Sequence, residues 1–182
     1  EFEAATEAYK DFVLMAKNDD LTDTAYQHLA SLYAAANEYE QTLLTYQRLL
    51  RRQPNNIPEL RYQMAQIHEE RGAYTRARQL RMQLIKEYPA HYRALSTLTQ
   101  LPWGKTPEEN HACAVVYFNH GQNKQAAKKF ERFLKNYPRH QLVAETRYKL
   151  GRAYQKDRQY DKALKAFTRA YKQHYYRSAL YR

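Results

Sequence analysis

Seven histidines, one cysteine and 19 Asp and Glu residues are the side chains of this 182-residue chain that could perform acid–base, nucleophilic or metal chemistry. A zinc-binding H-E-x-x-H motif needs a second histidine four residues after the first, and the stretch His68-Glu69-Glu70 lacks one. The sequence also has no G-x-S-x-G, no G-x-x-x-x-G-K and no paired cysteines. We therefore expect no catalytic centre, no metal and no cofactor, and we expect Cys113 to be a small core residue.

The elements that carry these side chains are predicted to be helices. Ala, Leu, Gln, Lys, Arg and Glu dominate the chain, only four residues are Gly, and Val and Ile are scarce. The six prolines fall between apolar-periodic runs, as expected for residues at helix ends. No apolar run approaches the roughly 20 residues that cross a bilayer. Composition thus indicates an all-α fold.

One order of small and aromatic residues recurs four times along the chain. In the stretch YKLGRAYQKDRQYDKALKAFTRAY, which begins at Tyr148, these residues follow the i, i+4, i+7 spacing of an amphipathic helix. Equivalent positions in the four copies are Ala30, Ala65, Ala114 and Gly151, which are separated by 35, 49 and 37 residues. The spacing predicts an array of helix pairs with about a dozen extra residues at one junction.

This pattern resembles the tetratricopeptide repeat, whose first helix has a Leu-Gly or Leu-Ala pair and a Tyr, and whose second has Ala, an aromatic residue and a closing Pro. The resemblance covers nearly the whole chain and implies a right-handed superhelix of antiparallel helix pairs. His68 stands where the family usually has Tyr, Arg81 where it has an aromatic residue, and Tyr175 where it has Pro.

The extra residues divide the predicted array into two halves. Residues 1–100 are predicted to hold a partial repeat, two repeats and an extra helix, residues 101–107 a seam loop, and residues 108–182 two repeats and the start of a third at Ser178. Trp103 is expected either to anchor the seam or to form a binding platform. Because the first helix of the first repeat is absent and the last repeat is incomplete, we expect this chain to be part of a longer array.

The resemblance implies that first helices line a concave surface that holds a protein or a polymer. The clamp of Lys and Asn residues by which some family members grip a peptide C-terminus is not carried over. Helical phase instead predicts a partner-binding face of Tyr62, Gln66, His111, Phe118, Tyr148, Arg152 and Gln155. The alternative interpretation is that some of these tyrosines only pack between helices.

Charge is distributed unequally along the chain. Residues 107–182 contain 17 Lys and Arg against 6 Asp and Glu, whereas residues 1–106 contain 13 of each. Two second helices carry basic stripes at positions 37 residues apart, which are Lys128, Arg132 and Lys135, then Lys165, Arg169 and Lys172. Such stripes favour an anionic partner, or they are an ordinary solvated face.

We predict a non-catalytic scaffold that binds a protein partner through its concave face. Repeat periods of 35 and 37 residues resemble those of bacterial envelope members of the family, such as the cell-division coordinator of the Tol-Pal system, outer-membrane assembly lipoproteins and the superhelical part of lytic transglycosylases. This likeness favours a periplasmic or envelope location, with the cytoplasm as the alternative. One alternative function is the helical region of a larger peptidoglycan- or polysaccharide-processing or export protein. Another is binding of an acidic segment, an envelope polymer or, less favoured, nucleic acid through the basic half.

Overall fold

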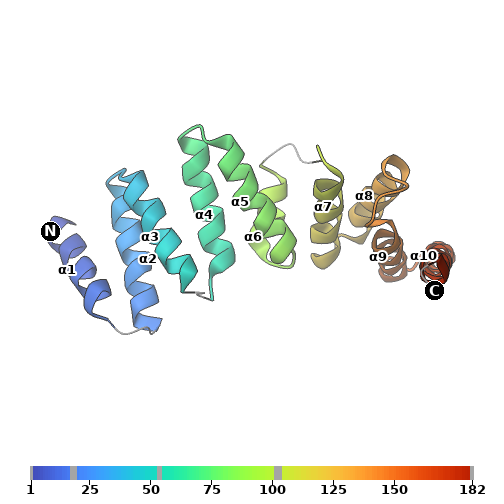
Figure 1. Ribbon diagram of the computed structural model, residues 1–182, viewed down its shortest axis with the longest axis horizontal. Coiled ribbons are helices and arrows are strands. Elements are labelled where there is room, and N and C mark those ends of the chain that lie inside the picture. Colours follow the sequence, from blue (N-terminus) through green and yellow to red (C-terminus); the bar gives the residue numbers. More distant parts are fainter. Residues whose placement is uncertain (1, 17–19, 53–54, 101–103, 181–182) are drawn as a thin grey trace. The chain divides into compact units, whose positions relative to one another are not determined.

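The computed structural model describes residues 2–16, 20–52, 55–100 and 104–180 of the chain (Figure 1). Within these residues the backbone forms ten α-helices and no strand, which confirms the all-α prediction. The helices are α1 (Phe2–Met15), α2 (Asp20–Ala35), α3 (Tyr39–Arg51), α4 (Ile57–Glu70), α5 (Tyr74–Glu87), α6 (Tyr92–Leu98), α7 (Pro107–Asn119), α8 (Asn123–Asn136), α9 (Val143–Lys156) and α10 (Tyr160–Leu180). The first helices of the four predicted pairs are α2, α4, α7 and α9.

Each helix pair turns at one residue with left-handed backbone geometry. In all four turns this residue takes the equivalent position, namely Asn37, Gly72, Gly121 and Arg158, with φ angles of 60°, 71°, 72° and 59°. The N–H of the next residue donates to a carbonyl five residues earlier, as from Gln122 to Tyr117 at 2.9 Å. This Schellman geometry ends each first helix by satisfying its free carbonyls. Gly72 and Gly121 therefore lie at two of the four hinges.

The chain divides into two compact units, and the first comprises Glu1–Arg81. Ala30, Ala65 and Ala77 have no exposed surface, and their small side chains pack against larger ones such as Leu49 and Leu60. About 25 cal/mol of stabilisation accompanies each square ångström of apolar surface buried in this way. The core of the first unit thus comes from the residues that define the repeat.

Arg81 occupies the position where the repeat usually has an aromatic side chain. It is only 1% exposed, and its Nε and Nη2 donate to the two carboxylate oxygens of Glu69 at 2.8 and 2.6 Å. Its guanidinium also lies 5.2 Å from the centre of the Tyr62 ring. A bidentate ion pair and a cation–π contact therefore fill the volume that an aromatic ring would otherwise fill.

The second unit comprises Met82–Arg182, and α7 to α10 form its main core. Phe130 is fully buried, Leu150 and Tyr154 are nearly so, and Phe167 packs against them. A Cβ atom on Gly151 would lie 2.6 Å from the Phe167 ring, so only glycine allows α9 to approach this close. Gly151 therefore lies where α9 and α10 approach closely.

A smaller core cluster joins the end of α5 to α6 and α7. Its buried residues include Ile85, Ala94 and Cys113, and Met82 packs against them. Cys113 is 3% exposed, which confirms its predicted place in the core. Helix α6 is the extra helix that lengthens this junction.

The boundary between the two units lies within α5, upstream of the predicted seam loop 101–107. Residues 101–103, including Trp103, are outside the described residues, so the seam and the role of Trp103 stay predictions. By contrast, the predicted new helix at Ser178 is wrong, because α10 continues from Tyr160 to Leu180. Tyr175 stands where the other repeats have proline, so this stretch contains no residue that interrupts a helix.

None of the helices in the described part of the chain is both long and apolar enough to cross a bilayer.

Candidate functional site

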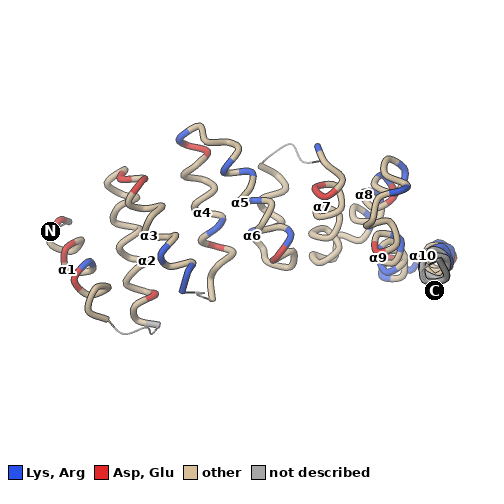
Figure 2. The backbone as a smooth tube through the Cα atoms, in the orientation of Figure 1, with Lys and Arg blue, Asp and Glu red and all other residues tan. Residues whose placement is uncertain are grey.

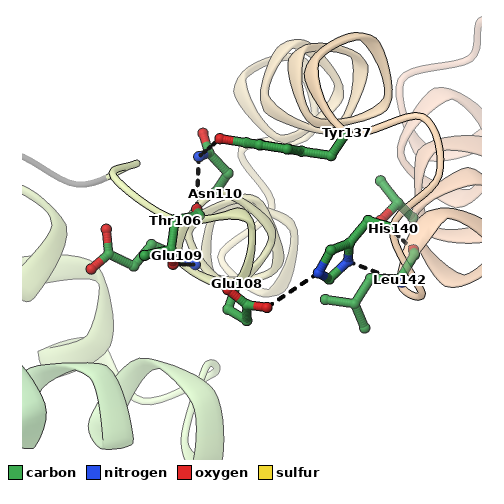
Figure 3. A network of polar contacts seen from close by, with 8 residues as sticks. Thr106, Glu108, Glu109, Asn110, Tyr137, His140 and Leu142 are labelled. Carbon is green, nitrogen blue, oxygen red and sulfur yellow. Dashed lines mark hydrogen bonds and ion pairs between the residues drawn. The ribbon is translucent and has the colours of Figure 1, made fainter.

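A network of hydrogen bonds fixes the first turn of α7 (Figure 3). The Thr106 hydroxyl accepts from the backbone N–H of Glu109 at 3.2 Å, so Thr106 caps the helix as predicted. The carboxylate of Glu109 accepts from the N–H of Lys105 at 2.9 Å. Asn110 Nδ2 donates to the Thr106 carbonyl at 2.9 Å and to the Tyr137 hydroxyl at 3.4 Å. This network ties the start of α7 to the end of α8.

His140 connects α7 to the segment that precedes α9. Its Nδ1 accepts from the Leu142 N–H at 3.3 Å, so Nε2 carries the ring hydrogen and donates to the Glu108 carboxylate at 3.2 Å (Figure 3). A hydrogen bond from its own backbone N–H, reinforced by His140, lowers the pKa of Glu108. Glu108 is therefore a fixed carboxylate at neutral pH.

The space that these contacts border is a groove of about 460 Å³ between the first helices α7 and α9. We call it the α7–α9 groove; its lining includes Glu108, His111, Val115, Gln141, Glu145 and Lys149. The sequence predicts His111 as a partner-binding residue, and the structure places it here. Because most of its lining residues lie on helices, the groove is already formed without a ligand.

His111 is the least satisfied polar side chain in this groove. It is 8% exposed, its ring packs against Phe130 and Phe133, and its Nε2 has no hydrogen-bond partner among the described residues. The nearest carboxylate oxygen is Glu145 Oε1 at 3.8 Å, just beyond hydrogen-bond range. Burial is the main cause that lowers the pKa of His111, and Lys149 adds to this effect while Glu145 opposes it. The imidazole is therefore neutral at pH 7.

Glu145 lies near two possible partners, Lys149 and His111. Its side chain is 49% exposed, it lies 3.5 Å from Lys149 Nζ, and a small rotation would bring it within hydrogen-bond range of His111. An exposed ion pair of this kind contributes only about 0.3–0.5 kcal/mol. The carboxylate can thus exchange Lys149 for a cationic or hydrogen-bonding group of a ligand at little cost.

A second, apolar cavity of about 530 Å³ lies on the other side of Glu145, between α9 and α10. Tyr148, Phe167 and Tyr171 line it, and the Tyr148 and Phe167 rings are 5.8 Å apart. The predicted residue Tyr148 is 51% exposed, and its hydroxyl accepts from Arg152 at 3.4 Å. The predicted residues His111 and Tyr148 thus line two cavities that share Glu145, and Arg152 contacts Tyr148.

The other predicted partner-binding residues line neither of these two cavities. Phe118 is half-buried, with Lys156 Nζ 4.6 Å from its ring centre, and Gln155 is exposed. Gln66 is exposed on α4, in the first unit. Tyr62, also on α4, is only 5% exposed beneath Arg81, which is the packing role that the alternative interpretation assigns to a tyrosine.

The basic stripe residues are exposed, and Lys and Arg recur along α8 and α10 (Figure 2). Three of the six, Lys135, Lys165 and Arg169, line a common cavity, whereas Lys128, Arg132 and Lys172 do not. The cavity also includes Arg147 and Lys162, which the stripe pattern does not contain. The structure therefore divides the predicted stripe into a groove part and a solvated part.

In the described ranges of the chain, no three His, Cys, Asp or Glu side chains are grouped as metal ligands would be. Sequence reasoning missed Glu108, Gln141, Glu145 and Lys149 as groove residues. Glu145 and Lys149 are an i, i+4 pair at the start of a first helix, but that pattern is also common on exposed helix faces. Only the packing of α7 against α9 shows that this pair lines a groove and does not lie on a fully exposed helix face.

Comparison with known proteins adds independent information on the family. A family model described as the tetratricopeptide repeat matches residues 24–56, 59–91 and 114–140, and a second one with the same description matches residues 148–182. No protein with a curated description matches the sequence.

Several solved structures are similar to this chain at low sequence identity. BtubC (BKLC) from P. vanneervenii is 19% identical, with a TM-score of 0.44, and the match covers 98% of this chain and 74% of that one. MamA from Desulfovibrio magneticus RS-1 is 15% identical, with a TM-score of 0.42 and coverage of 94% and 84%. YrrB, described as a TPR protein with an unusual peptide-binding site, is 18% identical, with a TM-score of 0.40 and coverage of 93% and 76%.

The matched segments cover well over half of the chain, and each contains one of the four hinges described above with parts of the two helices that it joins. This chain belongs to the tetratricopeptide repeat family.

Proposed function

We propose that this chain is a non-catalytic scaffold that binds a segment of another protein in the α7–α9 groove. The observation that carries the proposal is the arrangement around Glu145, where a half-exposed carboxylate lies beside the unpartnered Nε2 of buried His111 and a weakly held Lys149. A backbone N–H or a cationic side chain of a ligand would find a ready acceptor there. A buried polar group that lacks a hydrogen-bond partner favours any ligand that supplies one.

Two features of the surroundings support a polypeptide as the ligand. The α7–α9 groove combines both signs of charge with apolar residues such as Val115, and it borders the apolar cavity with Tyr148 and Tyr171. Mixed polar and aromatic surfaces of this kind are typical of protein-binding hot spots. The partner would place an apolar side chain beside Tyr148 and a polar group at Glu145.

We infer the absence of catalysis from the sequence, in which no catalytic motif with the required spacing occurs. The envelope location and the assembly in which the scaffold acts stay part of the proposal, and they rest on the repeat periods of 35 and 37 residues.

A charge-swap variant tests the groove. Exchanging the charges by Glu145→Lys with Lys149→Glu leaves the net charge unchanged but removes the acceptor beside His111. The matched control is Glu7→Lys with Lys10→Glu, which swaps an exposed ion pair of α1 whose N–O distance is 2.7 Å. Partners would be captured from a native lysate on each purified protein.

We expect the groove variant to retain roughly a tenth or less of a polypeptide that the unchanged chain and the control retain equally. Circular dichroism of both variants confirms that the helices are intact. Equal capture by all three proteins, or equal loss in both variants, would contradict the proposed site.

A further inference from the structure

A second groove, distinct from the proposed partner site, lies over α9 between α8 and α10. We call it the α8–α10 groove, and its volume is about 420 Å³. The five cationic side chains that line it come from three helices, namely Lys135 from α8, Arg147 from α9, and Lys162, Lys165 and Arg169 from α10. Lys162, Lys165 and Arg169 follow the i, i+3, i+7 spacing and therefore share one face of α10.

The positive charge of this groove is not balanced inside it. Glu131 is the one carboxylate among the lining residues that the structure describes, and it already accepts a hydrogen bond from the Tyr154 hydroxyl. Burial, followed by repulsion from Arg169, lowers the pKa of Arg147. Cations are thus close enough to disfavour one another, and an anionic ligand would relieve this repulsion.

The floor of the groove is apolar. Leu150 and Ala166 are buried and Leu134 is half-buried, and all three line the cavity beneath the cationic rim. An apolar side chain of a ligand would be shielded from water on this floor. Anionic groups on either side of it would contact the cationic side chains of the rim. A ligand that fits this groove must therefore carry an apolar side chain and negative charges close together.

This combination favours a protein segment over a nucleic acid. Single-stranded nucleic acids bind basic grooves by stacking bases on aromatic rings. Tyr154, the one aromatic residue that lines the described part of this groove, is 7% exposed, and Lys162 Nζ lies 5.4 Å from its ring centre. Its ring is therefore not available as a platform for bases.

We propose that the α8–α10 groove binds an acidic protein segment in which one aliphatic or aromatic residue is flanked by carboxylates. The apolar side chain contacts Leu134, Leu150 and Ala166, and the flanking carboxylates pair with Lys135 on one side and with Lys165 and Arg169 on the other. This site does not depend on the α7–α9 groove, so either proposal can fail without the other.

The basic stripe supplies a matched pair of variants to test this site. Lys165→Glu with Arg169→Glu reverses two charges that line the groove, whereas Lys128→Glu with Arg132→Glu reverses two exposed charges on α8 that do not. The probe is a short fluorescein-labelled peptide of Asp and Glu with one central Phe, and its binding is measured by fluorescence anisotropy. A peptide with Ser in place of Phe, a single-stranded oligothymidylate and phosphatidylglycerol vesicles are compared with it.

We expect saturable binding of the Phe peptide, with at least a tenfold loss in the Lys165/Arg169 variant and less than a twofold loss in the Lys128/Arg132 variant. The Ser peptide should bind several-fold more weakly. Equal loss in both variants would overturn the proposal in favour of diffuse charge attraction. Absence of saturable binding up to about 1 mM peptide, or tighter binding of the oligonucleotide or vesicles than of the peptide, would also overturn it.

Discussion

Arg81 is a charged side chain in the core of a repeat, and both carboxylate oxygens of Glu69 accept hydrogen bonds from it. It is 1% exposed, and the Glu69 side chain that holds it is 25% exposed. A buried cation without its partner destabilises a fold because it has lost its hydration. The same position filled by an apolar residue would carry no such requirement.

Replacement of Glu69 by Ala should therefore lower the free energy of unfolding by at least about 2 kcal/mol, because it removes the bidentate carboxylate partner of the buried Arg81 guanidinium. Urea denaturation followed by circular dichroism measures this change.

The double variant Glu69→Ala with Arg81→Leu is the informative control. An apolar pair of similar volume is often as stable as a buried ion pair, so we expect the second substitution to recover at least half of the loss. If the double variant is less stable than Glu69→Ala alone, Arg81 contributes through contacts other than this ion pair.

His111 makes the stability of the second unit depend on pH. Its pKa is lowered in the folded chain, mainly by burial, so the unfolded chain binds more protons as pH falls below the ordinary histidine value of about 6.5. The free energy of unfolding should therefore be constant above that pH and decline below it. Thermal unfolding between pH 7.5 and 5.5 measures the decline.

Substitution of His111 by Gln should flatten this pH profile, because an amide does not titrate. His68, whose pKa is also lowered mainly by burial, would account for a remaining slope, and His68→Gln in the same chain should remove it. A pH profile unchanged by both substitutions would show that neither histidine is buried in its neutral form.

At the scale of the elements, the four hinges have one geometry but different residues. Gly72 and Gly121 adopt positive φ without strain, whereas Arg158 adopts a φ of 59° with a Cβ atom present. A non-glycine residue in this region costs roughly 1–2 kcal/mol, and part of the gain from glycine is offset by the greater freedom of the unfolded chain.

We expect Arg158→Gly to raise the free energy of unfolding by about 0.5–1 kcal/mol, and Gly121→Ala to lower it by about 1 kcal/mol. A Cβ on Gly121 would meet no atom within 4 Å, so its effect would come from the backbone alone. Chemical denaturation of each variant provides the comparison.

Arg158→Ala serves as the control for charge, since it removes the guanidinium but keeps a Cβ atom. It should not stabilise the chain. If it stabilises as much as Arg158→Gly does, relief of charge repulsion rather than of backbone strain explains the gain.

The order of the elements could be predicted because small and aromatic residues recur at regular intervals in successive helix pairs, as at Ala30, Ala65 and Gly151. The bounds of α10 could not, because Tyr175 stands where the other repeats have the proline that would stop a helix. The positive φ of Arg158 could not be predicted either, because arginine has no preference for this conformation.

On the scale of the whole molecule, the chain consists of two compact units, and the excess positive charge lies in the second. Both candidate grooves also lie in that unit. Helical phase predicted His111 and Tyr148 as partner-binding residues, and they line two cavities that share Glu145, which helical phase could not reveal. The proximity of Glu145 to His111 depends on how α7 packs against α9, and the periodicity of one sequence does not predict that packing.

Site-specific photo-crosslinking tests the central claim, that the α7–α9 groove holds a partner polypeptide. A benzoylphenylalanine residue placed at Val115 would lie in the groove, and one at exposed Lys124 on α8 would lie outside it. We predict that irradiation in a native lysate links a discrete polypeptide to position 115 and not to position 124, and that the swap at Glu145 and Lys149 abolishes the product. The same products at both positions, or a product at position 115 that survives the swap, would contradict the claim.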